Sequence, residues 1–173
     1  MLAAMESPST PRDTRTLTET SSRTGMRIVL DTNVVVGLLV FADPLLVAVR
    51  EALERGEVIP LADDETLAEL ERVLRYPELR VDEERAVMLA GQYRALCTIV
   101  GFDAPVGPLM RLPLCRDRDD QKFLALTQRG RAEWLLTRDK ALLVMRRRVP
   151  FGITTPEEWA SSASTSSAGA IDR

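Results

Sequence analysis

Acidic side chains follow two apolar runs of the sequence, where they could bind a divalent metal ion. Asp31 directly follows the run 27–30, and Asp139 lies two residues after Thr137, which ends the run 133–137. Carboxylates held close together repel one another, so a shared site needs a cation between them at neutral pH. Hard cations such as Mg²⁺ prefer oxygen ligands, and a bound ion lowers the pKa of its water. Acids that met at one site would therefore support metal-dependent hydrolysis of phosphodiester bonds.

Further acids follow the apolar run 58–61 and lie in the helix after it. Asp63 and Asp64 follow this run, and Glu69 lies one turn or more into the helix that they open. Glu69 and Glu71 both flank the apolar face of that helix, so spacing alone does not choose between them. An Asp after a strand is also a common turn former or helix cap, and for Asp31 taken alone this alternative has equal weight.

The composition narrows the catalytic chemistry. The chain has 173 residues and no histidine, which excludes Ser-His-Asp and Cys-His catalysis, His-ligated zinc and histidine as a general acid or base. Its two cysteines, Cys97 and Cys115, are too few for a disulfide framework and fit reduced thiols in a cytoplasmic protein. The net charge of −3 and the 45% of hydrophobic residues fit one ordinary globular domain. No apolar run is long enough to span a membrane, so we expect no membrane association.

Alternating apolar and amphipathic segments predict the elements that hold these acids. We expect strands at 27–30, 58–61, 133–137 and 151–154. We expect helices at 33–40, 44–55, from 63 or 64 to 75, 82–98, 119–129 and 140–147, and a final helical turn at 156–159. Strands that alternate with helices predict an α/β fold with a mostly parallel sheet covered on both faces. In such folds ligands bind at the carboxyl ends of the strands, where Asp31 and Asp139 stand.

Two low-complexity segments flank the predicted domain. Residues 1–25 are rich in Ser, Thr and Pro, and residues 161–173 are rich in Ser and Ala. Segments with so few apolar residues do not build a core. We therefore expect disordered tails at 1–25 and 161–173 and a single domain at 26–160.

Several segments, in order, resemble the motifs of PIN-domain nucleases. MRIVLDTNVVV (26–36) is similar to the opening strand of the family with its Asp-Thr-Asn, and TLAELERVLRYP (66–77) to the helix that carries the second acid. CRDRDDQKFLAL (115–126) resembles the C-x-D-x-D-D-x-K-F-L stretch of a subgroup of toxins from toxin–antitoxin systems. AEWLLTRDKALL (132–143) resembles the family's A-D-x-L-[VL]-T-x-D-x-x-L strand and loop, and FGITTPEEW (151–159) also fits. The resemblance covers about residues 26–160.

The resemblance implies a fold, an activity and a set of site residues. The fold would be a three-layer α/β/α sandwich, and the activity that of an endoribonuclease dependent on Mg²⁺ or Mn²⁺. The catalytic and metal-binding acids would be Asp31, Glu69, Asp120 and Asp139. Asp31 and Asp120 would be the most direct ligands, with the other two acting directly or through water. Asn33 and Thr137 would orient the carboxylates.

The third acid of this set has three candidates. Asp117, Asp119 and Asp120 all lie near the matching position. We choose Asp120, because it precedes Phe123 and Leu124, whose side chains should face the sheet. Asp117 is the alternate ligand, and for Asp119 we expect a helix-capping role.

An RNA substrate would require positive charge beside the acids. The cations expected to bind it are Arg116, Arg118, Lys122, Arg138 and Lys140. The three arginines at 146–148 are better explained as a solvated helix end. The resemblance also implies a cognate antitoxin as a partner, and homodimers are common among relatives.

Two other functions are weighed against this one. HAD-type phosphatases also begin with a strand and an Asp, but they need a second Asp two positions later as acid and base. Asn33 stands at that position and does not transfer a proton, which disfavours a phosphatase. The other alternative is a PIN fold kept as a catalytically silent RNA- or partner-binding module. The presence of all four acids argues against it.

Overall fold

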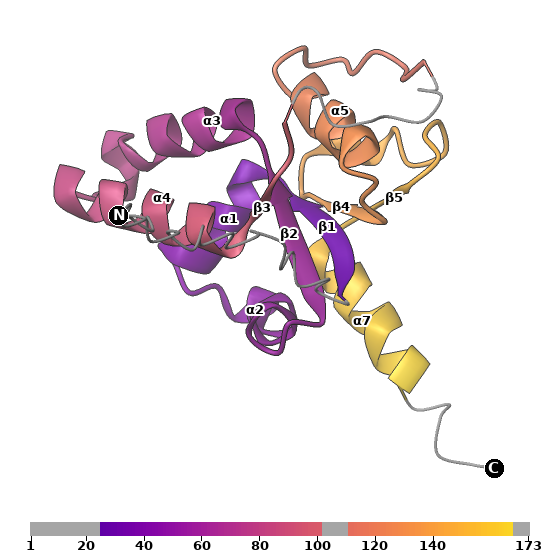
Figure 1. Cartoon of the computed structure of the whole chain (residues 1–173), viewed down its shortest axis with the longest axis horizontal. Coiled ribbons are helices and arrows are strands. Elements are labelled where there is room, and N and C mark those ends of the chain that lie inside the picture. The colour runs from indigo at the N-terminus through magenta and orange to yellow at the C-terminus, as the bar shows by residue number, and fades with distance from the viewer. Residues whose placement is uncertain (1–24, 102–110, 168–173) are drawn as a thin grey trace, which may run out of the picture.

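Five parallel strands form the centre of the molecule (Figure 1). The structure is a computed structural model, and it describes residues 25–101 and 111–167. Its strands are β1 (Met26–Leu30), β2 (Val58–Ala62), β3 (Thr98–Ile99), β4 (Trp134–Leu136) and β5 (Gly152–Thr154). They lie in the order β3-β2-β1-β4-β5, and every pair is parallel. The predicted α/β fold with a parallel sheet is confirmed.

Helices cover both faces of this sheet and complete three layers. One face carries α1 (Thr32–Leu39), α2 (Val47–Glu54), α3 (Asp64–Leu74), α4 (Glu83–Leu96) and the start of α7 (Pro156–Ser167). The other carries α5 (Gln121–Arg129) and α6 (Lys140–Leu143). Short 3₁₀ turns at Pro44–Leu46 and Pro77–Leu79 precede α2 and α4. The strand β1 buries alternate side chains in the two cores: Ile28 and Leu30 join the first, and Val29 joins the second.

The strand order brings the carboxyl ends of β1 and β4 together. The chain leaves β1 toward β2 on one side and returns through α5 to β4 on the other side. The backbone N–H of Asp31 donates to the carbonyl of Leu136 over 3.0 Å, which joins the two strand ends directly. Ligand sites of open α/β sheets lie at such a switch point.

Several predicted boundaries differ from the structure. The helix expected to run to residue 98 ends at Leu96, and Thr98–Ile99 forms the edge strand β3 instead. The helix expected from 119 begins at Gln121, and the one expected over 140–147 ends at Leu143. The final turn continues as α7 to Ser167, beyond residue 160. Of the predicted tails, residues 1–24 and 168–173 lie outside the described residues.

The longest helix among the described residues is α4, with 14 residues. No single helix among them is long and apolar enough to cross a membrane. The helix α1 and the segment Pro44–Glu54 are together long and apolar enough for a span, by length and composition only, but they are bent by 108° at the break between them.

Candidate active site

Asp31 is a nearly fully buried carboxylate at the end of β1. Its side chain is 3% exposed and accepts a hydrogen bond of 2.7 Å from Thr137 Oγ1, across the gap between β1 and β4. Burial raises the pKa of Asp31, while the Thr137 hydroxyl and the backbone N–H of Asn33 lower it, and the net pKa lies above its ordinary value. The negative charges of Glu69 and Asp139 raise it further. Asp31 therefore lies in an acidic environment.

Thr137 connects Asp31 to Asp139. The Thr137 side chain is fully buried, and its Oγ1 accepts a hydrogen bond of 2.9 Å from the backbone N–H of Asp139. Asp139 in turn begins α6, with its Oδ1 accepting from the backbone N–H of Ala141 over 2.6 Å. One hydroxyl thus orients a carboxylate and a loop at the same time. The predicted orienting role of Thr137 agrees with this geometry, whereas the Asn33 side chain is exposed and only its backbone acts on Asp31.

Asp120 has a buried carboxylate oxygen with no hydrogen-bond partner. It occupies the N-cap position of α5, yet its side chain makes no capping hydrogen bond. Within the part of the chain that the structure describes, its Oδ2 is buried and unpaired. Burial raises the pKa of Asp120 to about 6, and the neighbouring charges of Asp139, Asp31, Asp117 and Glu69 raise it as well. The four predicted acids therefore act on one another electrostatically.

Glu69 is the member of this group that already has a cation. Its carboxylate forms an ion pair with Lys122 Nζ, and the two side chains are only 16% and 8% exposed. Glu71, the alternative that spacing left open, is exposed on the same helix. Glu69 therefore faces the acids and Glu71 faces solvent. The role of Glu69 as the second acid, which the resemblance implied, stays a prediction.

The three Asp residues before α5 have different roles. Asp117 is exposed, and its Oδ1 accepts from the backbone N–H of Asp119 over 2.9 Å, a local turn contact. The expected capping role of Asp119 is wrong, because the turn shifts the N-cap position to Asp120. Only Asp120 has a buried carboxylate oxygen here. Phe123 and Leu124 are buried against the sheet, as the choice of Asp120 assumed.

Asp63, the acid that follows β2, is structural. Its side chain accepts from the Thr66 backbone N–H over 2.9 Å, and the Thr66 hydroxyl accepts from the Asp63 backbone N–H over 3.1 Å. This capping box starts α3 and sets the direction in which Glu69 projects. Asp63 also forms a buried ion pair with Arg129 of α5.

The donor set can be compared with the requirements of a metal ion. Within residues 25–101 and 111–167, no group of three or more Asp, Glu or Cys side chains is arranged to hold one. The chemistry of the donors nevertheless fits a hard divalent cation, because the set offers carboxylate oxygens alone. The unpaired Asp120 Oδ2 is an oxygen that such a cation would satisfy. Asp31, Asp120, Asp139 and Glu69 are the residues that would hold it.

Comparison with known proteins decides the family. The sequence model of one family, described as PIN domain, matches residues 27–141. The chain belongs to the PIN-domain family. A solved structure titled as the T. brucei RRP44 PIN domain is 12% identical, covers 85% of this chain and 86% of that chain, and has a TM-score of 0.45. No curated protein matches the chain.

The predicted RNA-binding cations of this PIN domain differ in how free they are. Arg116, Arg118 and Lys140 are exposed, and each is a sequence neighbour of Asp117 or Asp139. Arg138 donates to Asp43 over 2.7 Å and also forms an ion pair with Glu157, so a phosphate would compete with two carboxylates for it.

Two features of this PIN domain were missed by sequence reasoning. The ion pairs Lys122–Glu69 and Arg129–Asp63 both join α5 to the β2–α3 segment. Lys122 was expected to contact RNA, but it is buried among the acids. The available signal was its place two residues after Asp120, on the first turn of an amphipathic helix. A partner 53 positions away along the chain is not visible in local spacing.

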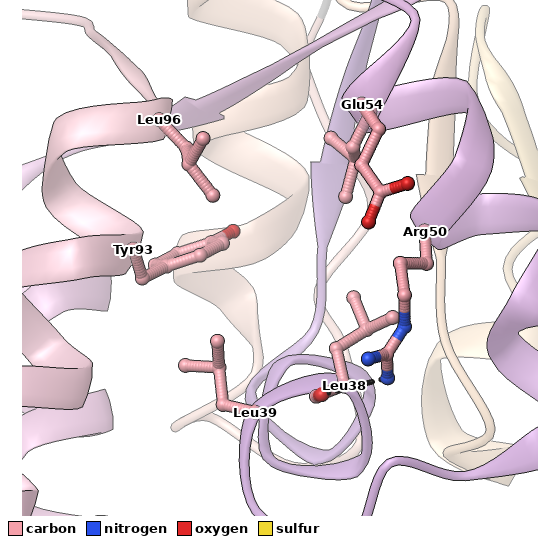
Figure 2. Close-up of a pocket in the computed structure, with 7 residues that line it drawn as sticks. Leu38, Leu39, Arg50, Glu54, Tyr93 and Leu96 are labelled. Atoms are coloured by element: carbon pink, nitrogen blue, oxygen red, sulfur yellow. Dashed lines mark hydrogen bonds between the residues drawn. The ribbon is translucent and has the colours of Figure 1, made fainter.

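An apolar pocket lies apart from the acids, between α1, α2 and α4 (Figure 2). Its volume is about 180 Å³, and Arg50 donates across it to the Leu38 carbonyl over 2.9 Å. The residues labelled in Figure 2 are Leu38, Leu39, Arg50, Glu54, Tyr93 and Leu96. None of the four predicted acids lines this pocket as the structure describes it. The candidate active site is therefore the acidic group at the switch point.

Proposed function

We propose that this PIN-domain protein is an endoribonuclease that depends on Mg²⁺ or Mn²⁺. The observation that carries the proposal is the buried, unpaired Oδ2 of Asp120 beside the charges of Asp31, Asp139 and Glu69. Leaving such an oxygen without a partner is unfavourable, and keeping several carboxylates together is also unfavourable. A structure that retains both features fits a site whose fold is adapted to a cation.

The residues of the site divide the work between them. A bound divalent cation supplies a Lewis acid for the phosphoryl oxygen and lowers the pKa of water. Asp31, after the end of β1, and Asp120, before the start of α5, would hold the ion. Thr137 fixes the orientation of Asp31 through its 2.7 Å hydrogen bond. Asp139, at the same end of the sheet, would complete the set of acids around the ion and help to position the attacking water.

The substrate in this proposal is RNA, bound by cations around the acids. Arg116, Arg118 and Lys140 are exposed and contact phosphates on either side of the scissile bond. Each contact of this kind weakens with salt, so cleavage should slow as the salt concentration rises. Arg138 contributes only where a phosphate displaces Asp43 or Glu157.

A cleavage assay with matched variants tests the activity. The purified full chain should cut single-stranded RNA in the presence of Mg²⁺ or Mn²⁺, and EDTA should stop it. Asp31→Asn should abolish cleavage. Asp64→Asn makes the same chemical change at an exposed residue of α3 and should leave cleavage unchanged. Cleavage that survives Asp31→Asn would refute the assignment of the site.

The same experiment separates the alternatives. If the wild type and Asp31→Asn bind RNA equally and neither cuts it, the protein is a binding module rather than a nuclease. If Asp31 carries a trapped phosphoryl group after incubation with a phosphate ester, the protein is a phosphatase. Equal cutting of DNA and RNA would keep the nuclease and change its substrate.

We also propose that the protein acts in the cytoplasm as the toxin of a toxin–antitoxin pair. The segment 115–126 supports this role through its resemblance to such toxins. Strong expression of the active protein should slow growth, and a neighbouring antitoxin, inserting an Arg among the acids, should restore it. Normal growth under strong expression would refute the toxin role and leave the nuclease untouched. A homodimer is a further proposal, tested by the mass of the purified chain in solution.

A further inference from the structure

Lys122 is a buried lysine that pairs with one of the four acids, Glu69, rather than being displayed to solvent. Its side chain is 8% exposed and projects from the first turn of α5 toward α3. The ammonium pairs with Glu69 Oε2 and donates to the backbone carbonyl of Asp119 over 2.5 Å. It also lies 5.4 Å from the centre of the Phe123 ring. A lysine held by these contacts is poorly placed to bind a nucleic-acid phosphate.

The placement of Lys122 explains an asymmetry among the four acids. Within the described residues Asp120 Oδ2 is buried without a partner, while the Glu69 carboxylate, whose charge acts on Asp120, has a full positive charge at hydrogen-bond distance. Burying a charge is costly unless an opposite charge is paired with it. Lys122 thus neutralises one carboxylate of the group and leaves the others uncompensated.

We propose that Lys122 is the built-in counter-cation of the acidic site, and that it competes with the divalent metal ion for Glu69. The inference rests on the metal dependence of the proposed function. Glu69 in this arrangement is held by Lys122, and Asp31, Asp120 and Asp139 are the acids left for the metal. Lys122 is a positioning residue: it acts on the ion through Glu69.

The competition follows from charge. A divalent cation that approached the acids would meet the ammonium of Lys122 as a like charge, in surroundings where water screens it poorly. It would also lose the Glu69 carboxylate, whose oxygen is already engaged. Both effects weaken metal binding. Removing the ammonium should therefore strengthen metal binding. The full gain requires that the Glu69 carboxylate is present to bind the ion.

Manganese binding by the full chain without nucleic acid tests this inference. Free Mn²⁺ is measured by electron paramagnetic resonance during titration of the wild type, Lys122→Met, Lys122→Arg and Glu69→Gln. Lys122→Met keeps the length of the side chain and removes its charge. We expect it to bind Mn²⁺ about tenfold more tightly than the wild type, a factor modest for a charge pair in partly screened surroundings. Lys122→Arg keeps the charge and should stay within about threefold of the wild type.

A double variant distinguishes competition for Glu69 from a general effect of charge. In the Glu69→Gln background, removing Lys122 should change Mn²⁺ affinity less than about threefold, because the contested carboxylate is gone. The inference is refuted if Lys122→Met binds Mn²⁺ with unchanged or weaker affinity, or if it gains as much affinity in the Glu69→Gln background. If Lys122→Met does not fold without metal, Mn²⁺ should restore its circular dichroism spectrum, and failure to do so also refutes it.

Failure of this inference differs from failure of the proposed function. If the wild type binds Mn²⁺ and cuts RNA but Lys122→Met has unchanged Mn²⁺ affinity, the proposed competition is refuted and the proposed nuclease activity stands. If Lys122→Met binds Mn²⁺ more tightly but the wild type cuts no RNA, the competition is supported and the proposed nuclease activity is refuted.

Discussion

Thr137 offers the sharpest test of how this fold holds its acids. Its hydroxyl makes two buried contacts: it donates to Asp31 over 2.7 Å and accepts from the Asp139 backbone N–H over 2.9 Å. Thr137→Val has nearly the same shape and removes both contacts without opening a cavity. Thr137→Ser keeps the hydroxyl and removes only a methyl group, so it is the matched control.

The magnitude follows from the two contacts. A hydrogen bond to a charged group stabilises by about 1.5–3 kcal/mol, and a buried backbone N–H left unpaired costs about 1–3 kcal/mol. Thr137→Val should therefore lower the free energy of unfolding by about 3 kcal/mol or more. Loss of one buried methyl group in Thr137→Ser should cost about 1 kcal/mol. For a chain of this size, 3 kcal/mol corresponds to a fall in Tm of roughly 6–12 °C.

Urea unfolding at two pH values checks both the size and the cause. The Thr137 hydrogen bond lowers the pKa of Asp31, so its loss raises a folded-state pKa that burial has already raised. In Thr137→Val the folded state then binds more protons than the unfolded state over a wider pH range. The stability of this variant therefore falls more steeply as pH rises than that of the wild type. The cost of Thr137→Val should be larger at pH 7.5 than at pH 4. Equal stability of the Val and Ser variants at pH 7.5 would refute the reasoning.

Three further changes have defined outcomes. The pKa of Asp120 is raised to about 6 from 3.8, so in urea unfolding the stability of the wild type relative to Asp120→Asn should fall as pH rises from about 4 to 6. Gly152→Ala would place a Cβ 2.2 Å from the Trp134 ring and should lower the free energy of unfolding by about 1–3 kcal/mol. In Gly91→Ala, on α4, the new Cβ would have no atom within 4 Å, and the change should raise the free energy of unfolding by up to about 1 kcal/mol. Thermal melts of the two glycine variants that shift in the same direction would contradict these contacts.

The central part of the site could be read from the sequence because it depends on strand ends. Asp31 and Asp139 follow apolar runs, and parallel strands bring such residues to one edge of the sheet. Their joint placement needed only the alternation of strands and helices. Glu69 and Asp120 needed more, because helix spacing left Glu71 open and the turn before α5 offered three Asp residues. The resemblance to PIN domains selected both, and in the structure the Glu69 side chain and one Asp120 oxygen lie away from solvent.

The remaining differences have one tertiary cause and one local cause. Thr98 and Ile99 of β3 are β-branched, but two residues are too few to show alternation, and they form a strand because Leu61 and Ala62 of β2 pair with them. Likewise, α5 starts at Gln121 because Asp117 closes a local turn on Asp119. In the first case a contact between distant segments set the boundary, and in the second a side-chain turn that helical periodicity does not reveal.

The buried pairs of α5 show why the site is more than its four acids. Lys122 pairs with Glu69 near one end of α5, and Arg129 pairs with Asp63 at the other end, so the helix is fixed to the β2–α3 segment at two points. Asp120 lies at the start of the same helix, and its position relative to Glu69 is therefore set by these pairs. A helix held only by apolar packing could slide or rotate slightly, and Asp120 would move with it. The ion pairs restrict such movement, because displacing α5 would separate two buried charges from their partners at once.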